Sequence, residues 1–145
     1  MPPTSLAEEE LTRSIIGAFY RVHRALGFGF LEHVYVMALE RELLSRGHRV
    51  GREVSVRIEY MGAELCAQRL DMVVDEKVVV EIKSTLELHR AAPRQLYNYL
   101  RASNLEVGLL LYFGREPEFY RLFCPNRPGQ ALGAGRVPPT KKIGP

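Results

Sequence analysis

A strongly alternating stretch between Arg69 and Lys83 constrains the fold of this chain more than any other feature. On each side of a short charged segment every second residue is apolar, which is typical of two strands that each bury one face. One face is expected to pack against the core and to carry Leu70, Met72, Val74, Val78, Val80 and Ile82. The other face is expected to carry Arg69, Asp71, Val73, Val79, Glu81 and Lys83. The two strands, predicted at about 66–74 and 78–84, therefore form a β-hairpin.

The length of the hairpin loop decides which residues face each other. The apolar residues of both strands lie on one face only if the residue numbers of each facing pair have an even sum. The loop must therefore contain an odd number of residues. A loop of residues 75–77 places Asp71 opposite Glu81 and Arg69 opposite Lys83. A two-residue loop would separate the carboxylates onto different faces. We predict the three-residue loop.

Two carboxylates that face each other across a strand pair repel one another unless a cation lies between them. Lys83 follows Glu81 by two residues and is one such cation. A divalent metal ion is another, because hard oxygen ligands at this separation suit Mg²⁺ or Mn²⁺. The same residues would also be ordinary as a solvated cluster of charges on an exposed sheet face. The residues alone leave the metal site and the solvated cluster equally open.

Glu32 is a second unusual carboxylate, because it shares a helical face with apolar residues. These are Tyr35, Val36, Leu39 and Leu43. Burial of an unpaired carboxylate is costly, so Glu32 needs a partner. One interpretation is a first-turn glutamate stabilised by the positive end of its helix, and position alone favours it. The other is a carboxylate that points into the same site as Asp71 and Glu81.

The helix predicted after the second hairpin strand places Gln95 at the edge of an apolar stripe. From there its amide could reach a phosphate or a water molecule of a metal site, although a glutamine at the edge of a core is equally ordinary. Tyr97 and Tyr99 on the same helix are expected to serve packing. The histidines lack ligand spacing, and neither a glycine-rich phosphate loop nor a nucleophile elbow is present. We therefore predict no catalytic histidine.

Helical and strand periodicities place the remaining elements on both sides of the hairpin. Ser5 to Glu8 has the pattern of a capping box and predicts the start of a first helix. A second helix is predicted at about 30–45, with Gly47 as its C-terminal cap. The other elements are a strand near 54–60, a helix at about 91–103, a buried strand at 107–113 and a short strand at 119–124. The resulting α-α-β-β-β-α-β-β order predicts an α/β structure in which helices flank a mixed β-sheet.

The composition changes abruptly after Cys124, where proline and glycine become frequent and acidic residues are absent. This segment lacks the apolar residues that a core requires, so we expect residues 1–124 to form a single domain and residues 125–145 a disordered basic tail. Four of the 20 basic residues lie in the tail, and the remaining 16 oppose all 17 acidic residues in the domain. The net charge of +3 therefore says little about the partner of the domain.

Composition also argues against several classes of protein. A hydrophobic content of 46% in 145 residues fits one globular domain, and no apolar run is long enough for a membrane helix. The N-terminus contains consecutive glutamates and no apolar core, unlike a secretory signal. Two cysteines are too few for a disulfide framework or a zinc site. We predict a cytoplasmic protein that does not bind membranes.

Four short motifs occur in order along the chain. They are Gly29-x-x-Glu32-x-x-Tyr35, Arg69-x-Asp71, Glu81-Ile82-Lys83 and Gln95-Leu96-x-Asn98-Tyr99-Leu100. Together they resemble the GxxExxY protein family, which is placed within the PD-(D/E)XK nuclease superfamily. The resemblance covers about 11–113 and implies a restriction-endonuclease-like core with a metal site on its central hairpin. It departs at Leu70 and Phe28, where the superfamily or the family often has proline, and neither position is a ligand.

The resemblance implies a role for each candidate residue. Asp71 and Glu81 would bind Mg²⁺ or Mn²⁺, with the Ile82 carbonyl as a further ligand. Lys83 would orient or polarise the attacking water and stabilise charge on the phosphate, while the metal ion acts as a Lewis acid and activates water. The flanking helices would contribute an acidic residue and a polar residue, which are Glu32 and Gln95.

The function that the resemblance implies is a metal-dependent nuclease that hydrolyses phosphodiester bonds in DNA or RNA. The alternative is a non-catalytic module that keeps the nuclease fold and binds nucleic acid or a protein, and a small structural domain is a third possibility. All acidic and lysine positions of the motifs are present, which favours catalysis, because a degenerate copy loses them freely. A domain of this size has few recognition elements, so we also expect a homodimer or a partner subunit.

Overall fold

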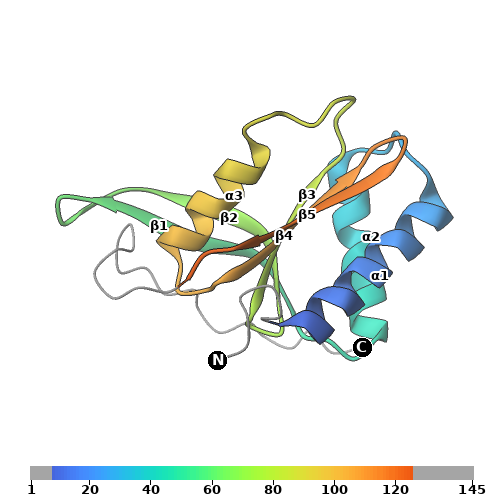
Figure 1. The fold of residues 1–145 in the computed structure, drawn as a ribbon, viewed down its shortest axis with the longest axis horizontal. Helices are drawn as coiled ribbons and strands as arrows, with labels where there is room; N and C mark the ends of the chain where they lie inside the picture. The colour runs from blue at the N-terminus through green and yellow to red at the C-terminus, as the bar shows by residue number, and fades with distance from the viewer. Residues whose placement is uncertain (1–7, 126–145) are drawn as a thin grey trace.

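The computed structural model describes residues 8–125, which form three helices and five strands in the expected order (Figure 1). The helices are α1 (Glu9–Leu26), α2 (Glu32–Ser45) and α3 (Ala92–Ala102). The strands are β1 (Val50–Tyr60), β2 (Ala63–Val74), β3 (Val78–Lys83), β4 (Val107–Phe113) and β5 (Pro117–Phe123). Apart from Pro125, the predicted basic tail lies outside the described residues. No helix within residues 8–125 is long and apolar enough to cross a membrane.

All five strands form one sheet in the order β1-β2-β3-β4-β5. Neighbouring strands are antiparallel except β3 and β4, which are parallel. A parallel pair cannot be joined by a tight turn, and here the connection from β3 to β4 contains α3. The mixed α/β layout predicted from the sequence is therefore confirmed.

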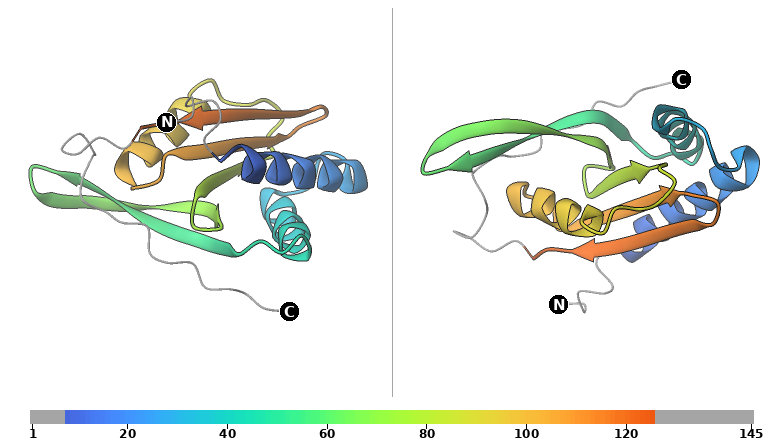
Figure 2. Two further views of the ribbon diagram at one scale, coloured as in Figure 1. Left: turned by 60° about the horizontal axis from the view of Figure 1, so that its bottom comes forward. Right: turned by 90° about the horizontal axis from the view of Figure 1, so that it is seen from above.

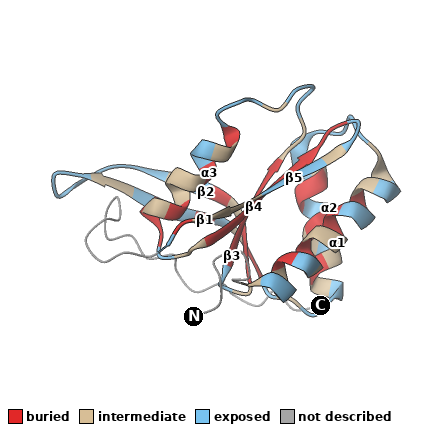
Figure 3. Cartoon of the chain, viewed as in Figure 1, coloured by how far each residue is buried: buried red, intermediate tan, exposed pale blue. Residues whose placement is uncertain are grey.

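Helices cover both faces of the sheet, so the fold has three layers (Figure 2). α1 and α2 pack on one face, and α3 packs on the other through Leu96 and Leu100. All of β4 is buried (Figure 3), as its nearly continuous apolar run predicts. β1 and β2 extend away from the helices as a long ribbon (Figures 1 and 2), and the outer residues of β2 are exposed.

The faces of the hairpin differ from the sequence prediction at Leu70. As expected, the side that meets α1 and α2 carries Met72, Val74, Val78, Val80 and Ile82. Leu70, however, packs on the α3 side of the sheet. The same change occurs in β1, where Val50 packs on the side of α1 and α2 and Val54 packs on the α3 side. Between them Glu53 has a left-handed φ of 52°, and the β1–β2 ladder skips the pair of Glu53 and Asp71. The prediction for Leu70 is therefore wrong, because a local irregularity of the backbone interrupts the alternation.

Three further boundaries differ from the prediction. α1 begins at Glu9 and not within the expected capping box, of which Ser5 lies outside the described residues. α2 begins at Glu32 rather than near Phe30, although Gly47, with a φ of 88°, closes its C-terminus as predicted. The ribbon of β1 and β2 is longer than predicted, because exposed residues lack the alternation that marks a half-buried strand.

A chain of hydrogen bonds holds the β2–β3 loop against α1. His48 Nδ1 lies 2.7 Å from Asp75 Oδ2, and its Nε2 lies 2.7 Å from the Ser14 hydroxyl. Arg49 N–H donates to the other carboxylate oxygen of Asp75 at 2.8 Å. Asp75 and Glu76 have left-handed φ values of 51° and 60°, which non-glycine residues rarely adopt without support from neighbours. The network therefore stabilises the loop whose length sets the hairpin register.

Replacing His48 with alanine is expected to lower the free energy of unfolding by about 1–3 kcal/mol, because the partly buried Asp75 carboxylate loses a hydrogen-bond partner. Urea unfolding followed by circular dichroism measures this loss. His33→Ala is the matched control, since His33 is exposed. Equal stability of the two variants would show that the hydrogen-bond chain does not stabilise the loop.

Candidate active site

Two carboxylates bridge the strands β2 and β3 where their ladder ends. Asp71 N–H donates to Glu81 Oε1 at 3.0 Å, and Ile82 N–H donates to Asp71 Oδ2 at 2.8 Å. Each carboxylate is thus held by a backbone amide of the opposite strand. We call this arrangement of Asp71, Glu81 and Ile82 the fork. The register of the ladder leaves a loop of three residues, so the predicted loop is confirmed and Asp71 faces Glu81.

Burial makes the carboxylates of the fork hard to ionise. Glu81 is only 7% exposed. Its burial, together with the neighbouring Asp71 carboxylate, raises the pKa of Glu81 to about 8, although Lys83 opposes this shift. Burial also raises the pKa of Asp71, while the hydrogen bond from Ile82 N–H favours its charged form. Without further positive charge the pair therefore tends to hold a proton.

Lys83 and Glu32 extend the fork into a larger charge cluster. The Lys83 ammonium opposes the rise in the pKa of Glu32, Asp71 and Glu81. It therefore lies within electrostatic reach of each of these carboxylates. Glu32 is exposed as a residue, yet partial burial and the Asp71 carboxylate raise its pKa. No side-chain hydrogen bond caps the N-terminus of α2. The Glu32 carboxylate therefore lies near the fork and does not serve only its own helix.

The donor atoms of the fork are hard oxygens. Within residues 8–125, no three side chains of His, Cys, Asp or Glu are arranged to hold a metal ion, so Glu32 does not complete a three-carboxylate site. The remaining donors are the carboxylates of Asp71 and Glu81 and the carbonyl oxygen of Ile82. This set fits Mg²⁺ or Mn²⁺, because Mg²⁺ is usually held by one or two carboxylates while water and phosphate fill its other positions.

The arginine of the cluster is not the one predicted from the sequence. Arg69, expected on the same face as Asp71, is exposed and pairs with Ser55 of β1. Arg52 instead lowers the pKa of Asp71, and it forms an ion pair with Glu40 at 2.9 Å. Its Nε is buried and has no acceptor among the described residues. Arg52 precedes the alternating residues that mark β1 in the sequence, so no pattern indicated it.

α3 brings two polar residues to the same region. Tyr99 packs against the α3-side core, as predicted, but its pKa is raised by burial and then by the Glu81 and Asp71 carboxylates. Its side chain therefore also faces the fork. Gln95 lies one turn earlier on the same side of α3 and is exposed. The spacing of four residues between them is the signal that could have identified Tyr99.

Residues 9–122 match the family model of the PD-(D/E)XK nuclease superfamily, a region that includes the whole charge cluster. The chain belongs to the PD-(D/E)XK nuclease superfamily. The mixed sheet with helices on both faces is the restriction-endonuclease-like fold of this superfamily. PD-(D/E)XK nucleases generally use divalent metal ions, and the superfamily implies a nucleic-acid substrate.

The crystal structure of SSO0001 has a similar fold, with a TM-score of 0.52 and 22% sequence identity to this PD-(D/E)XK domain. The similarity covers 89% of this chain and 65% of SSO0001, so the chain spans less than two thirds of that protein. At this identity the similarity shows the fold alone. No curated protein sequence matches the chain significantly.

Proposed function

We propose that this PD-(D/E)XK domain is a metal-dependent nuclease of the GxxExxY type, which hydrolyses phosphodiester bonds in DNA or RNA. The fork carries the proposal: backbone amides of opposite strands hold the Asp71 and Glu81 carboxylates beside the Lys83 ammonium. Buried like charges oppose folding, and strongly shifted pKa values of this kind cluster at functional sites. The sequence also left open a solvated cluster of charges, but a glutamate that is only 7% exposed, as Glu81 is, does not fit a solvated cluster.

Mg²⁺ or Mn²⁺ is the expected cofactor. The carboxylates of Asp71 and Glu81 and the carbonyl oxygen of Ile82 would hold the ion, and Glu32 would add negative charge from α2. A bound ion supplies Lewis acidity toward the phosphate and lowers the pKa of water. Its positive charge would also oppose the burial and the repulsion from Asp71 that together raise the pKa of Glu81.

The polar groups of the chain would then divide the remaining tasks. Lys83 would orient the attacking water and stabilise the negative charge that develops on the phosphate, because a fixed ammonium in a partly dry site interacts strongly with such charge. Gln95, an exposed residue one turn before Tyr99 on α3, would donate a hydrogen bond to a phosphate oxygen. These roles follow the residue types and their places around the fork.

A homodimer or a partner subunit would add contacts to DNA or RNA. The tip of the β1–β2 ribbon supports such a contact, since Tyr60, Met61 and Leu65 are 59%, 89% and 64% exposed. Exposed apolar side chains that gather in one place are typical of interaction sites. The cytoplasmic location stays a prediction.

Two measurements on the same protein test the proposed function. Mn²⁺ at a hundredfold excess over its Kd is expected to stabilise the fold by roughly 2.7 kcal/mol, which calorimetry detects. A labelled oligonucleotide is expected to be cleaved only while metal is present, and EDTA should stop the cleavage. A folded protein that responds to Mn²⁺ in neither measurement would instead be the non-catalytic binding module.

A further inference from the structure

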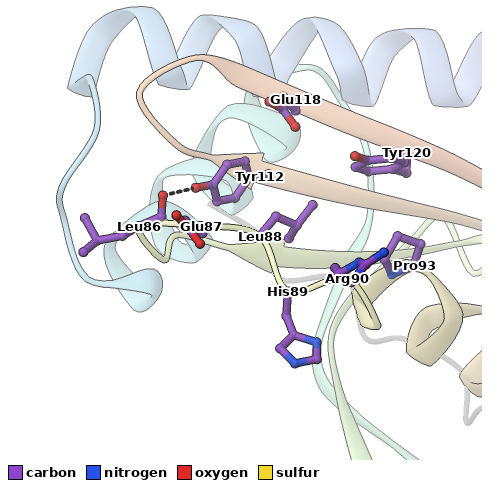
Figure 4. A pocket seen from close by; sticks show the side chains of 9 residues that line it. All are labelled: Leu86, Glu87, Leu88, His89, Arg90, Pro93, Tyr112, Glu118 and Tyr120. Carbon is purple, nitrogen blue, oxygen red and sulfur yellow. Dashed lines mark hydrogen bonds between the residues drawn. The ribbon is translucent and has the colours of Figure 1, made fainter.

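A hollow of about 420 Å³ lies where α3 begins (Figure 4). The loop between β3 and α3 supplies Leu86, His89 and Arg90 to its lining, and the strands β4 and β5 supply Tyr112, Glu118 and Tyr120. The other lining residues belong to the same loop and to the first turn of α3. None of these residues has a task in the proposed function.

Cross-strand pairing connects the hollow with the active site. Residues that pair directly across neighbouring strands share one face of the sheet. Lys83 pairs with Tyr112, while Glu81 pairs with Leu110 and Leu110 pairs with Tyr120. Two strand spacings separate Glu81 from Tyr120, which corresponds to about 10 Å. The hollow therefore lies on the same face as the carboxylates, next to the place where a phosphate would be cleaved.

Two tyrosine side chains line one wall of the hollow, and hydrogen bonds hold the first of them, Tyr112. The Tyr112 hydroxyl shares its one proton between the carbonyl oxygens of Thr85 and Leu86, at 2.7 and 2.8 Å, and the contact with Leu86 is drawn in Figure 4. These bonds hold the loop against β4. Tyr120 stays 40% exposed, and the side chain of Leu86 is fully exposed at 100%. A flat aromatic surface of this kind is suited to stacking with another ring.

The charges around the hollow are mixed. Arg90 and His89 are basic, and the first turn of α3 contains no acidic residue that would offset the positive end of that helix. The carboxylates of Glu87 and Glu118 line the same hollow. Duplex DNA is bound mainly through many cations that neutralise its phosphates, and this hollow does not offer them. One arginine beside the exposed Tyr120 suits a single phosphate and its base.

We propose that the hollow binds one nucleotide of an unpaired DNA or RNA strand, adjacent to the cleaved phosphate, and so selects single strands over duplex. The base stacks on Tyr120 and the phosphate pairs with Arg90. An unpaired base exposes its ring face to aromatic side chains, whereas the bases of a duplex are stacked on one another. This inference rests on the proposed function, because it names the substrate class of the same site.

Fluorescence anisotropy in EDTA measures this binding without cleavage. Labelled single-stranded DNA, single-stranded RNA and the matching DNA duplex are titrated with the full-length protein, and the single strands are expected to bind at least tenfold more tightly than the duplex. The relative affinities for DNA and RNA identify the preferred strand. Tyr120→Leu should weaken single-strand binding about tenfold, while Tyr120→Phe should retain it, because phenylalanine keeps a stacking ring. Glu118→Gln should strengthen binding by removing a repulsive charge.

Tyr20→Leu is the matched control, because Tyr20 is 38% exposed, much like Tyr120, but lies on α1, which packs against the opposite face of the sheet. If Tyr120→Leu fails to fold, Arg90→Gln carries the same expected loss. Equal affinities of the parent, Tyr120→Leu and Arg90→Gln, or duplex binding as tight as single-strand binding, would overturn the inference. The experiments distinguish this inference from the proposed nuclease function. Binding that depends on Tyr120, in a protein that shows no metal-dependent cleavage, would contradict the nuclease function and leave the inference standing.

Discussion

In the absence of metal ions, Glu81→Gln is expected to be more stable than the parent protein above about pH 8, and it should lose the response to Mn²⁺. The folded protein holds the Glu81 proton up to a pKa of about 8, compared with 4.5 for an ordinary glutamate. The stability linked to this proton is fully present below about pH 4.5 and is lost as pH rises through about 8. Deprotonation therefore destabilises the parent protein, and glutamine avoids it.

The expected slope is about 1 kcal/mol of unfolding free energy per pH unit between the two pKa values. The raised pKa values of Asp71 and Glu32 act in the same direction. Glutamine keeps an oxygen that can accept the hydrogen bond from Asp71 N–H but has no charge to bury. Bound metal reverses the trend, because it binds the ionised carboxylates and competes with protons. Mn²⁺ should therefore stabilise the parent protein more as pH rises.

Thermal unfolding in EDTA from about pH 5 to pH 9 measures the effect. Glu116→Gln is the matched control, since Glu116 is exposed on the turn between β4 and β5. The difference in melting temperature between the parent and Glu81→Gln isolates the contribution of Glu81 at each pH. A difference that does not change with pH would show that Glu81 is ionised in the fold without a stability cost.

Lys83→Met is expected to reduce cleavage about 10²- to 10³-fold, while Mn²⁺ binding is kept or strengthened. The reduction follows from the loss of a positive charge near the phosphate in the transition state. Metal binding should persist because the carboxylates of Asp71 and Glu81 remain, and because the ammonium that competes with the ion for them is gone. Glu81→Ala should instead abolish both metal binding and cleavage, which separates a ligand from a catalytic cation.

Nuclease assays and Mn²⁺ calorimetry on Lys83→Met, Glu81→Ala and Lys77→Met measure this separation. Lys77 is the matched control, because it is an exposed lysine in the loop of the same hairpin. Cleavage by Lys83→Met at the parent rate would contradict the role of the ammonium. Loss of Mn²⁺ binding in Lys83→Met would contradict the division between ligand and cation.

Local patterns in the chain were sufficient to predict much of the architecture. Alternation on both sides of residues 75–77 determines the hairpin register, and with it the meeting of Asp71 and Glu81. The apolar run of β4 predicts complete burial, because a strand covered on both faces needs no polar side. Both inferences depend only on the periodicity of side chains along one strand. That periodicity is a property of the extended backbone, whatever packs against it.

Other features depend on segments that are far apart in the sequence. The left-handed backbone of Glu53 turns β1 and β2 so that Leu70 changes sides, which alternation cannot show. Arg52 and Tyr99 reach the fork from β1 and α3, and each has an ordinary place in its own element. Their relation to the carboxylates arises only when helices and sheet pack together.

Local sequence patterns therefore predict the order of the elements, the hairpin register and the residue types at the fork. The tertiary structure decided which side chains surround the fork and where the hollow of Tyr112 and Tyr120 lies. The physical reason is the range of the interactions. Strand alternation and loop length act over a few neighbouring residues, whereas burial and charge–charge interactions depend on distances through space.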